Sequence, residues 1–105
     1  NLIVLSPLGY LDFVQLQNNS QVILTDSGSI QEEACILGIP CMTIRDNTER
    51  PESIEVKANV LTKSDYKSIK ESFEKQTKIF TDWKNPYGDG TASQQILDVC
   101  LAYEN

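Results

Sequence analysis

The stretch Thr25-Asp26-Ser27-Gly28-Ser29-Ile30-Gln31-Glu32-Glu33-Ala34 decides how the chain is organised. It follows the apolar run 22–24 and opens a helical pattern that stops at Gly38. A strand that passes through a short turn into a helix leaves unpaired backbone N–H groups at the helix start, where the helix dipole adds positive potential. This arrangement predicts an anion site at the turn, with phosphate as the natural ligand.

Three small residues of this turn are the candidate phosphate ligands. Ser27 and Ser29 can each donate a hydroxyl hydrogen bond, and Gly28 lets a ligand approach the backbone closely. The alternative is a capped helix without a ligand, because Ser29 and Glu32 have the S-x-x-E spacing of a capping box. The pattern alone favours the capped helix, since short Gly/Ser turns before helices are common in α/β proteins.

The two neighbouring carboxylates of the stretch are predicted to face in different directions. On a helical wheel of about 100° per residue, Glu33 falls between Ile36 and Leu37 on the apolar side, whereas Glu32 points away. A carboxylate on the covered side needs a partner, and a sugar hydroxyl would serve as well as a protein donor. Glu33 is therefore a candidate for binding a sugar.

The composition excludes several classes of function. With 15 acidic against 9 basic residues and a net charge of -6, the 105-residue chain does not offer a nucleic-acid surface. It has no apolar run long enough to span a membrane. The chain has no His, which removes a Ser-His-Asp triad and a His-paired catalytic Cys, and its three scattered Cys indicate reduced, mostly buried thiols of a cytoplasmic protein. We expect no metal and no cofactor.

Short apolar runs alternate with helical patterns along the chain, which predicts right-handed β-α-β units and a parallel sheet. The expected strands, all short and apolar, are residues 2–5, 22–25, 41–44 and 59–61. The expected helical segments are 10–17, 30–37, a turn at 54–56, a helix from 64 with Ile69, Phe73 and Phe80 on one face, and 91–103. The chain begins at Asn1, directly in a strand-like run, which suggests that the start of the natural protein is missing.

Parallel sheets bind ligands at the carboxyl ends of their strands, which brings the loops 6–9, 26–29 and 45–50 to one rim. We therefore expect Phe13, Ser27 and Arg50 to gather there. The guanidinium of Arg50 is a planar fork that suits phosphate oxygens. Without further information, solvent-exposed ion pairs in this charged loop are an equally good interpretation.

Four strings along the chain resemble the C-terminal part of the non-hydrolysing UDP-N-acetylglucosamine 2-epimerases. They are PLGYLDF at 7–13, LTDSGSIQEEA at 24–34, RDNTERPE at 45–52 and NPYGDG at 85–90. They occur in the right order over nearly the whole chain, and D-S-G-x-I-Q-E-E and T-E-R-P-E are specific. The resemblance implies a GT-B type protein with two Rossmann-like domains, in which residues 1–105 are a single partial domain from the distal part of the second.

In that family the C2 centre of UDP-GlcNAc is inverted to give UDP-ManNAc. A base removes the C2 proton, UDP leaves by elimination and then adds back, so UDP has to stay bound throughout. The residues that the resemblance assigns to UDP are Phe13 on the uracil, Ser27, Gly28 and Ser29 on the diphosphate, Glu33 on the ribose hydroxyls and Arg50 on phosphate. Three departures are Ser29, Lys57 and Lys63, each of which stands where the family usually has Gly.

The resemblance also places the acid/base carboxylates and the His of the family in the N-terminal portion. We therefore expect no catalytic residue in this fragment, which should be inactive alone. The expected partners are a UDP-sugar, the N-terminal domain of the same protein and a second copy in a homodimer. The alternatives are a relative that uses another UDP-N-acetyl sugar, an epimerase that hydrolyses its product, and a non-catalytic nucleotide-binding module.

Overall fold

The computed structural model describes residues 1–103. The elements, in chain order, are α1 (Tyr10–Asn18), β1 (Ile23–Thr25), α2 (Gly28–Leu37), β2 (Cys41–Ile44), α3 (Pro51–Glu55), β3 (Asn59–Thr62), α4 (Tyr66–Gln76) and α5 (Ala92–Tyr103). The strands form a parallel sheet in the order β1-β2-β3. The predicted α/β fold, a Rossmann-like parallel sheet with flanking helices, is confirmed.

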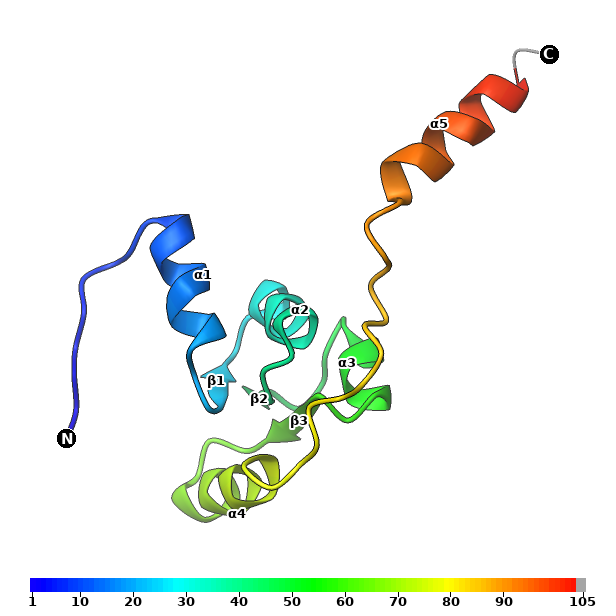
Figure 1. Cartoon of the computed structure of the whole chain (residues 1–105). Coiled ribbons are helices and arrows are strands. Elements are labelled where there is room, and N and C mark those ends of the chain that lie inside the picture. Colours follow the sequence, from blue (N-terminus) through cyan, green and yellow to red (C-terminus); the bar gives the residue numbers. More distant parts are fainter. Residues whose placement is uncertain (104–105) are drawn as a thin grey trace.

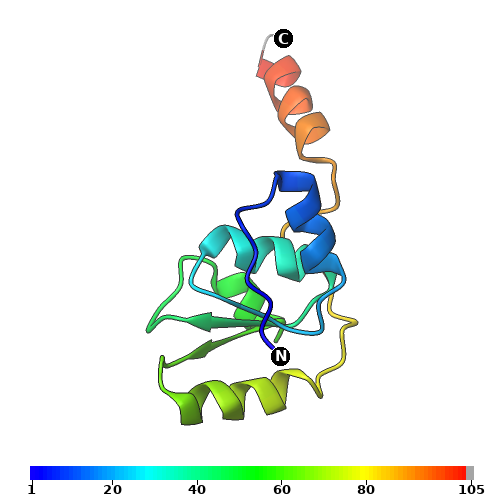
Figure 2. The same cartoon turned by 90° about the vertical axis from the view of Figure 1, so that its left-hand side faces the viewer.

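The sheet lies between two layers of helix. Helices α1, α2 and α3 lie on one side of it and α4 on the other, while α5 projects away at the end of an extended segment (Figures 1 and 2). The central strand β2 is covered on both faces, and Cys41, Met42 and Thr43 are all buried. Parallel strands that are covered on both faces have nearly continuous apolar sequences, so the bounds of β2 can be predicted from the sequence.

Helix α2 begins two residues earlier than the capping-box interpretation requires. Ser27 is its N-cap, and the Ser27 hydroxyl accepts a hydrogen bond from the backbone N–H of Ile30 at 3.5 Å. Ser29 therefore lies inside the first turn, and no Ser29–Glu32 capping box forms. The helix ends at Gly38, whose φ of 77° is the left-handed conformation typical of a helix C-terminus.

The prediction of a buried strand at residues 2–5 is wrong. Leu2 and Val4 are 88% and 83% exposed, and no strand assigned within residues 1–103 includes this segment. An apolar run becomes a buried strand only where a neighbouring strand supplies hydrogen bonds and another layer covers its side chains. In this structure β1 forms the edge of the sheet, and the segment does not pair with it.

Two expectations about apolar side chains also fail. Helix α4 ends at Gln76, so Phe80 lies beyond it and is 87% exposed rather than sharing a face with Ile69. Helix α5 forms as expected, but its apolar positions and Cys100 are all exposed. Only Cys35 and Cys41 are buried thiols, and desolvation raises the pKa of Cys41 to about 11. Within residues 1–103, no helix is both long and apolar enough to cross a membrane.

Lys57 adopts a left-handed backbone conformation, with φ of 65°, in the turn that leads into β3. A side chain in this region costs about 1–2 kcal/mol, which Gly avoids. We therefore expect Lys57→Gly to stabilise the protein by roughly 0.5–1 kcal/mol. The gain is smaller than the relieved strain, because Gly loses more backbone entropy on folding. Urea unfolding checks this, and a less stable variant would contradict it.

Candidate functional site

Two of the three predicted rim loops meet at the start of α2. The carboxyl ends of β1 and β2 lie side by side, with Thr25 opposite Thr43, so the turn 26–27 and the loop 45–50 leave the same edge of the sheet. A Cβ added at Gly28 would lie 3.8 Å from Cγ of Arg50 and 3.8 Å from Oε2 of Glu49. The stem of Arg50 thus passes directly beside the N-terminal turn of α2.

Phe13 lies on the other side of that turn. It is half-buried in α1 and lines a cavity of about 210 Å³ together with Thr25 at the end of β1 and Ile30 in the first turn of α2. The structure therefore places Phe13 and Arg50 on the two flanks of the N-terminus of α2. The loop at residues 6–9, by contrast, follows no strand assigned within residues 1–103 and is exposed.

Arg50 is held by its backbone and by two nitrogens of its guanidinium. Its backbone N–H donates to the Thr48 hydroxyl at 3.0 Å, and its Nη1 donates to the carbonyl of Glu49 at 3.2 Å. Its Nε lies 2.7 Å from Oε1 of Glu32, which makes an ion pair. The Nε–H does not point at this oxygen well enough to form a hydrogen bond. Within the described residues Nη2 makes no hydrogen bond, so its N–H groups can donate to a ligand.

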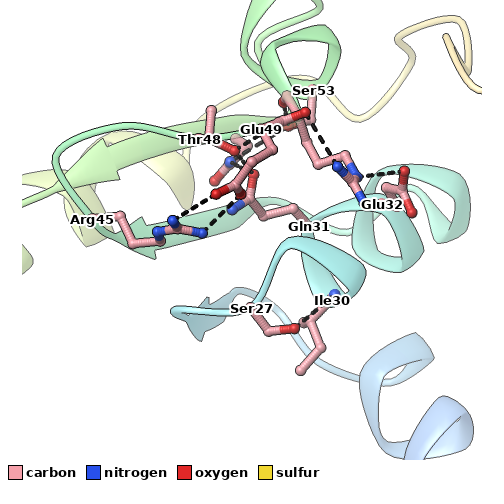
Figure 3. Close-up of polar contacts among 10 residues, drawn as sticks. Ser27, Ile30, Gln31, Glu32, Arg45, Thr48, Glu49 and Ser53 are labelled. Atoms are coloured by element: carbon pink, nitrogen blue, oxygen red, sulfur yellow. Dashed lines mark hydrogen bonds and ion pairs between the residues drawn. The ribbon is translucent and has the colours of Figure 1, made fainter.

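The prediction that Glu32 points away from the covered side is wrong. Glu32 lies four residues after Gly28, so both face the same way on α2, and this face meets the loop 45–50. Figure 3 shows Glu32 on α2 with its carboxylate turned toward that loop. A wheel drawn for one helix assigns a polar residue to solvent, because it cannot show that a later loop folds over it.

A second ion pair stands beside the first. Arg45 donates from both terminal nitrogens to Glu49, at 2.9 and 2.8 Å, and this contact lowers the pKa of the Glu49 carboxyl. Both residues are labelled in Figure 3, where their side chains lie above the start of α2. The pair neutralises a carboxylate that would otherwise repel an anion at the helix N-terminus.

Buried hydrogen bonds fix the loop 45–50 against α2 and the sheet. Oε1 of Gln31, which is fully buried, accepts from the Thr48 hydroxyl at 2.8 Å and from the Asn59 amide at 3.1 Å. Oδ1 of Asn59 in turn accepts from the Thr43 hydroxyl at 2.9 Å. The sequence analysis did not single out Gln31, although its spacing of three and four residues from the buried Ala34 and Cys35 places it on their face.

Glu33 faces the covered side of α2, as its position on the helical wheel indicates. It is half-buried, and its Oε2 accepts a hydrogen bond from Nε2 of Gln17 in α1 at 2.7 Å. Its other oxygen makes no hydrogen bond within the described residues, so Glu33 can still accept from a ligand hydroxyl. Its assignment to ribose stays a prediction.

The substitution Glu33→Gln separates binding from folding. A Gln keeps an oxygen that can accept from Gln17, so we expect the free energy of unfolding to change by less than about 1 kcal/mol. A neutral amide is a weaker acceptor for ribose hydroxyls, so UDP affinity should fall roughly three- to tenfold. Calorimetric titration with UDP checks this, with Glu74→Gln at an exposed position of α4 as the charge control. A large loss of melting temperature at normal affinity would make Glu33 a structural residue.

Comparison with known proteins decides the family. A family model described as UDP-N-acetylglucosamine 2-epimerase matches residues 1–101. The chain belongs to this family. It is 47% identical over 96 residues to the UDP-N-acetylglucosamine 2-epimerase of Methanococcus maripaludis, an alignment that covers 91% of the chain and 26% of that relative.

Solved structures of 2-epimerases have the same fold. The chain matches the Methanocaldococcus jannaschii UDP-GlcNAc 2-epimerase, solved in complex with UDP-GlcNAc and UDP, with a TM-score of 0.85 and 45% identity over 93% of the chain. It matches the Neisseria meningitidis UDP-GlcNAc 2-epimerase bound to UDP-GlcNAc with a TM-score of 0.78 and 40% identity, also over 93% of the chain. The chain spans 27% and 28% of these two structures. The expected membership of the C-terminal domain of a GT-B type protein is thereby confirmed.

Proposed function

We propose that this chain is the UDP-holding part of an enzyme that interconverts UDP-GlcNAc and UDP-ManNAc. The observation that carries the proposal is the approach of Arg50 to the N-terminal turn of α2, where a Cβ on Gly28 would be 3.8 Å from the Arg50 stem. A guanidinium fork and unpaired helix amides beside one another form a site for a doubly charged group such as a diphosphate. The solved relatives with bound UDP-GlcNAc support this choice of ligand.

The site would act on the leaving group of the reaction. When a base outside this chain removes the C2 proton, the C1–O bond breaks and its electron pair leaves with UDP. Arg50 and the amides at Gly28 and Ser29 would stabilise the charge that grows on the diphosphate. The same contacts would retain UDP until it adds back to the unsaturated sugar. Phe13 would pack against the uracil, and Glu33 would hold the ribose from the α1 side.

Hydrogen exchange from solvent during turnover tests this function. The full-length protein is given UDP-GlcNAc in heavy water, and the nucleotide sugars are followed by NMR. We expect deuterium at C2 of both epimers without net loss of UDP. Release of free ManNAc would instead indicate a hydrolysing epimerase, and turnover of only another UDP-N-acetyl sugar would change the substrate. The 105-residue chain alone should show no exchange, since the base lies outside it.

In the cell, this activity would supply a cytoplasmic sugar nucleotide for surface polysaccharide. The proposed assembly is a homodimer of the full-length protein, in which the N-terminal domain closes over the UDP. Sedimentation of the full-length protein measures the oligomeric state. A monomer that retains full epimerase activity would contradict the dimer without affecting the proposed chemistry.

Replacing the glycine of the turn tests the approach of the diphosphate. In Gly28→Ala the added Cβ meets only ordinary contacts at 3.8 Å, and Ala suits a helix better than Gly, so stability should change by less than about 1 kcal/mol. The methyl group would stand between the ligand and the backbone amides, so UDP affinity should fall roughly three- to tenfold. Titration calorimetry and thermal unfolding of the same samples measure both quantities. Unchanged affinity would move the phosphates away from this turn.

A further inference from the structure

Glu32 stands at a place that the proposed UDP contacts do not use. It lies on α2 one turn after Gly28, and its Oε1 is 2.7 Å from Nε of Arg50. The two side chains are 35% and 37% exposed, so the pair is partly shielded although it borders solvent. Helix α2 therefore carries both the backbone amides of the turn and the anion that faces Arg50.

The edge of the guanidinium that Glu32 faces decides what the contact can do. Glu32 approaches Nε, and Nη1 donates to the Glu49 carbonyl, while Nη2 makes no hydrogen bond within the described residues. A carboxylate on Nη1 and Nη2 together would compete with phosphate for the terminal edge of the fork. A carboxylate on Nε leaves that edge free and limits rotation about the last bonds of the side chain.

The rest of Arg50 is already fixed from other directions. Its backbone is tied to Thr48, whose hydroxyl is itself bonded to the buried Gln31, and its stem passes beside Gly28. The guanidinium at the end of this long side chain is held by the Glu49 carbonyl at Nη1 and by Glu32 at Nε. An unbound arginine loses rotamer freedom when it binds a ligand, and a partner that orders it beforehand reduces this cost.

We propose that Glu32 is a positioning residue, which orients the guanidinium of Arg50 so that its terminal nitrogens face the diphosphate at the start of α2. This inference rests on the proposed function, because it acts through the phosphate contact of Arg50. Glu32 itself does not touch the ligand. Its negative charge so near the site would by itself disfavour a diphosphate, so a net gain of affinity from Glu32 requires the contact with Arg50.

The test is a double-mutant cycle on UDP affinity in the full-length protein, with Glu32→Gln, Arg50→Ala and the double variant. We expect Glu32→Gln to weaken UDP binding roughly three- to tenfold, the scale of a partly shielded ion pair and the ordering it provides. In the Arg50→Ala background the same change should alter affinity less than about twofold, because no guanidinium remains to be oriented. Glu71→Gln at an exposed position of α4 removes the same charge as a control.

The outcomes distinguish an error in the role of Glu32 from an error in the proposed function. Tighter UDP binding by Glu32→Gln would mean that Glu32 competes with phosphate, and an equal loss in both backgrounds would mean a general structural role. Either result overturns the inference and leaves the proposed function standing. If Arg50→Ala itself leaves UDP affinity unchanged, the phosphate assignment of the proposed function fails first. Thermal unfolding of each variant shows whether an affinity loss follows from a damaged fold.

Discussion

Arg50→Ala in the full-length protein should weaken UDP binding by roughly 1.5–3 kcal/mol, which corresponds to about 10- to 150-fold in Kd. Arg50 is the cation whose stem lies beside the N-terminal turn of α2, and its Nη2 makes no hydrogen bond within the described residues. Hydrogen bonds between charged groups are stronger than neutral ones, so their loss has a large effect. Titration calorimetry at a fixed, moderate salt concentration measures the change.

A matched control makes this result specific. Lys67 is an exposed cation on α4, on the far side of the sheet, and Lys67→Ala removes the same charge from the protein. We expect Lys67→Ala to leave UDP affinity within twofold, since an exposed charge at this distance is largely screened. If Arg50→Ala behaves like Lys67→Ala, Arg50 is not a phosphate ligand. Melting temperatures should change little in both variants, because the Arg50 side chain contributes a partly exposed ion pair and one exposed hydrogen bond.

The sequence predicts the parts of the fold that local patterns determine. The strand at 41–44 and the helix starting near Gly28 follow from an apolar run, a small-residue turn and a terminal Gly, all of which act within a few residues. The approach of Arg50 to the turn at Gly28 also follows, because parallel strands place their carboxyl ends on one edge.

The errors arise where distant parts of the chain decide the outcome. The apolar run at 2–5 has the composition of a strand, but a strand needs a paired neighbour that composition does not supply. Glu32 was assigned to solvent because its partner, Arg50, comes eighteen residues later in a loop. Gln31 and Asn59 are polar residues in a core position, and only the tertiary structure shows that each has a hydrogen-bond partner.

Asn59→Leu should be the most destabilising of these substitutions, at roughly 2–4 kcal/mol, because Asn59 joins β3 to both β2 and α2. Its side chain is almost fully buried, accepts from the Thr43 hydroxyl at 2.9 Å and donates to Gln31 at 3.1 Å. A Leu fills a similar volume but leaves the Thr43 hydroxyl without its partner in the core. Gln31 keeps its bond from Thr48, so we expect the loop to loosen rather than detach.

The loss should be partly reversible, which distinguishes a polar network from simple packing. Thr43→Val removes the hydroxyl that Asn59→Leu leaves without a hydrogen-bond partner. The double variant Asn59→Leu, Thr43→Val should therefore be more stable than Asn59→Leu alone by about 1 kcal/mol or more. Urea unfolding of the two single variants and the double variant measures this recovery. A double variant whose loss equals the sum of the single losses would show that the Thr43–Asn59 hydrogen bond adds nothing beyond packing. Because Asn59 reaches Thr48 through Gln31, and Thr48 bonds the backbone of Arg50, a loosened network should also weaken UDP binding.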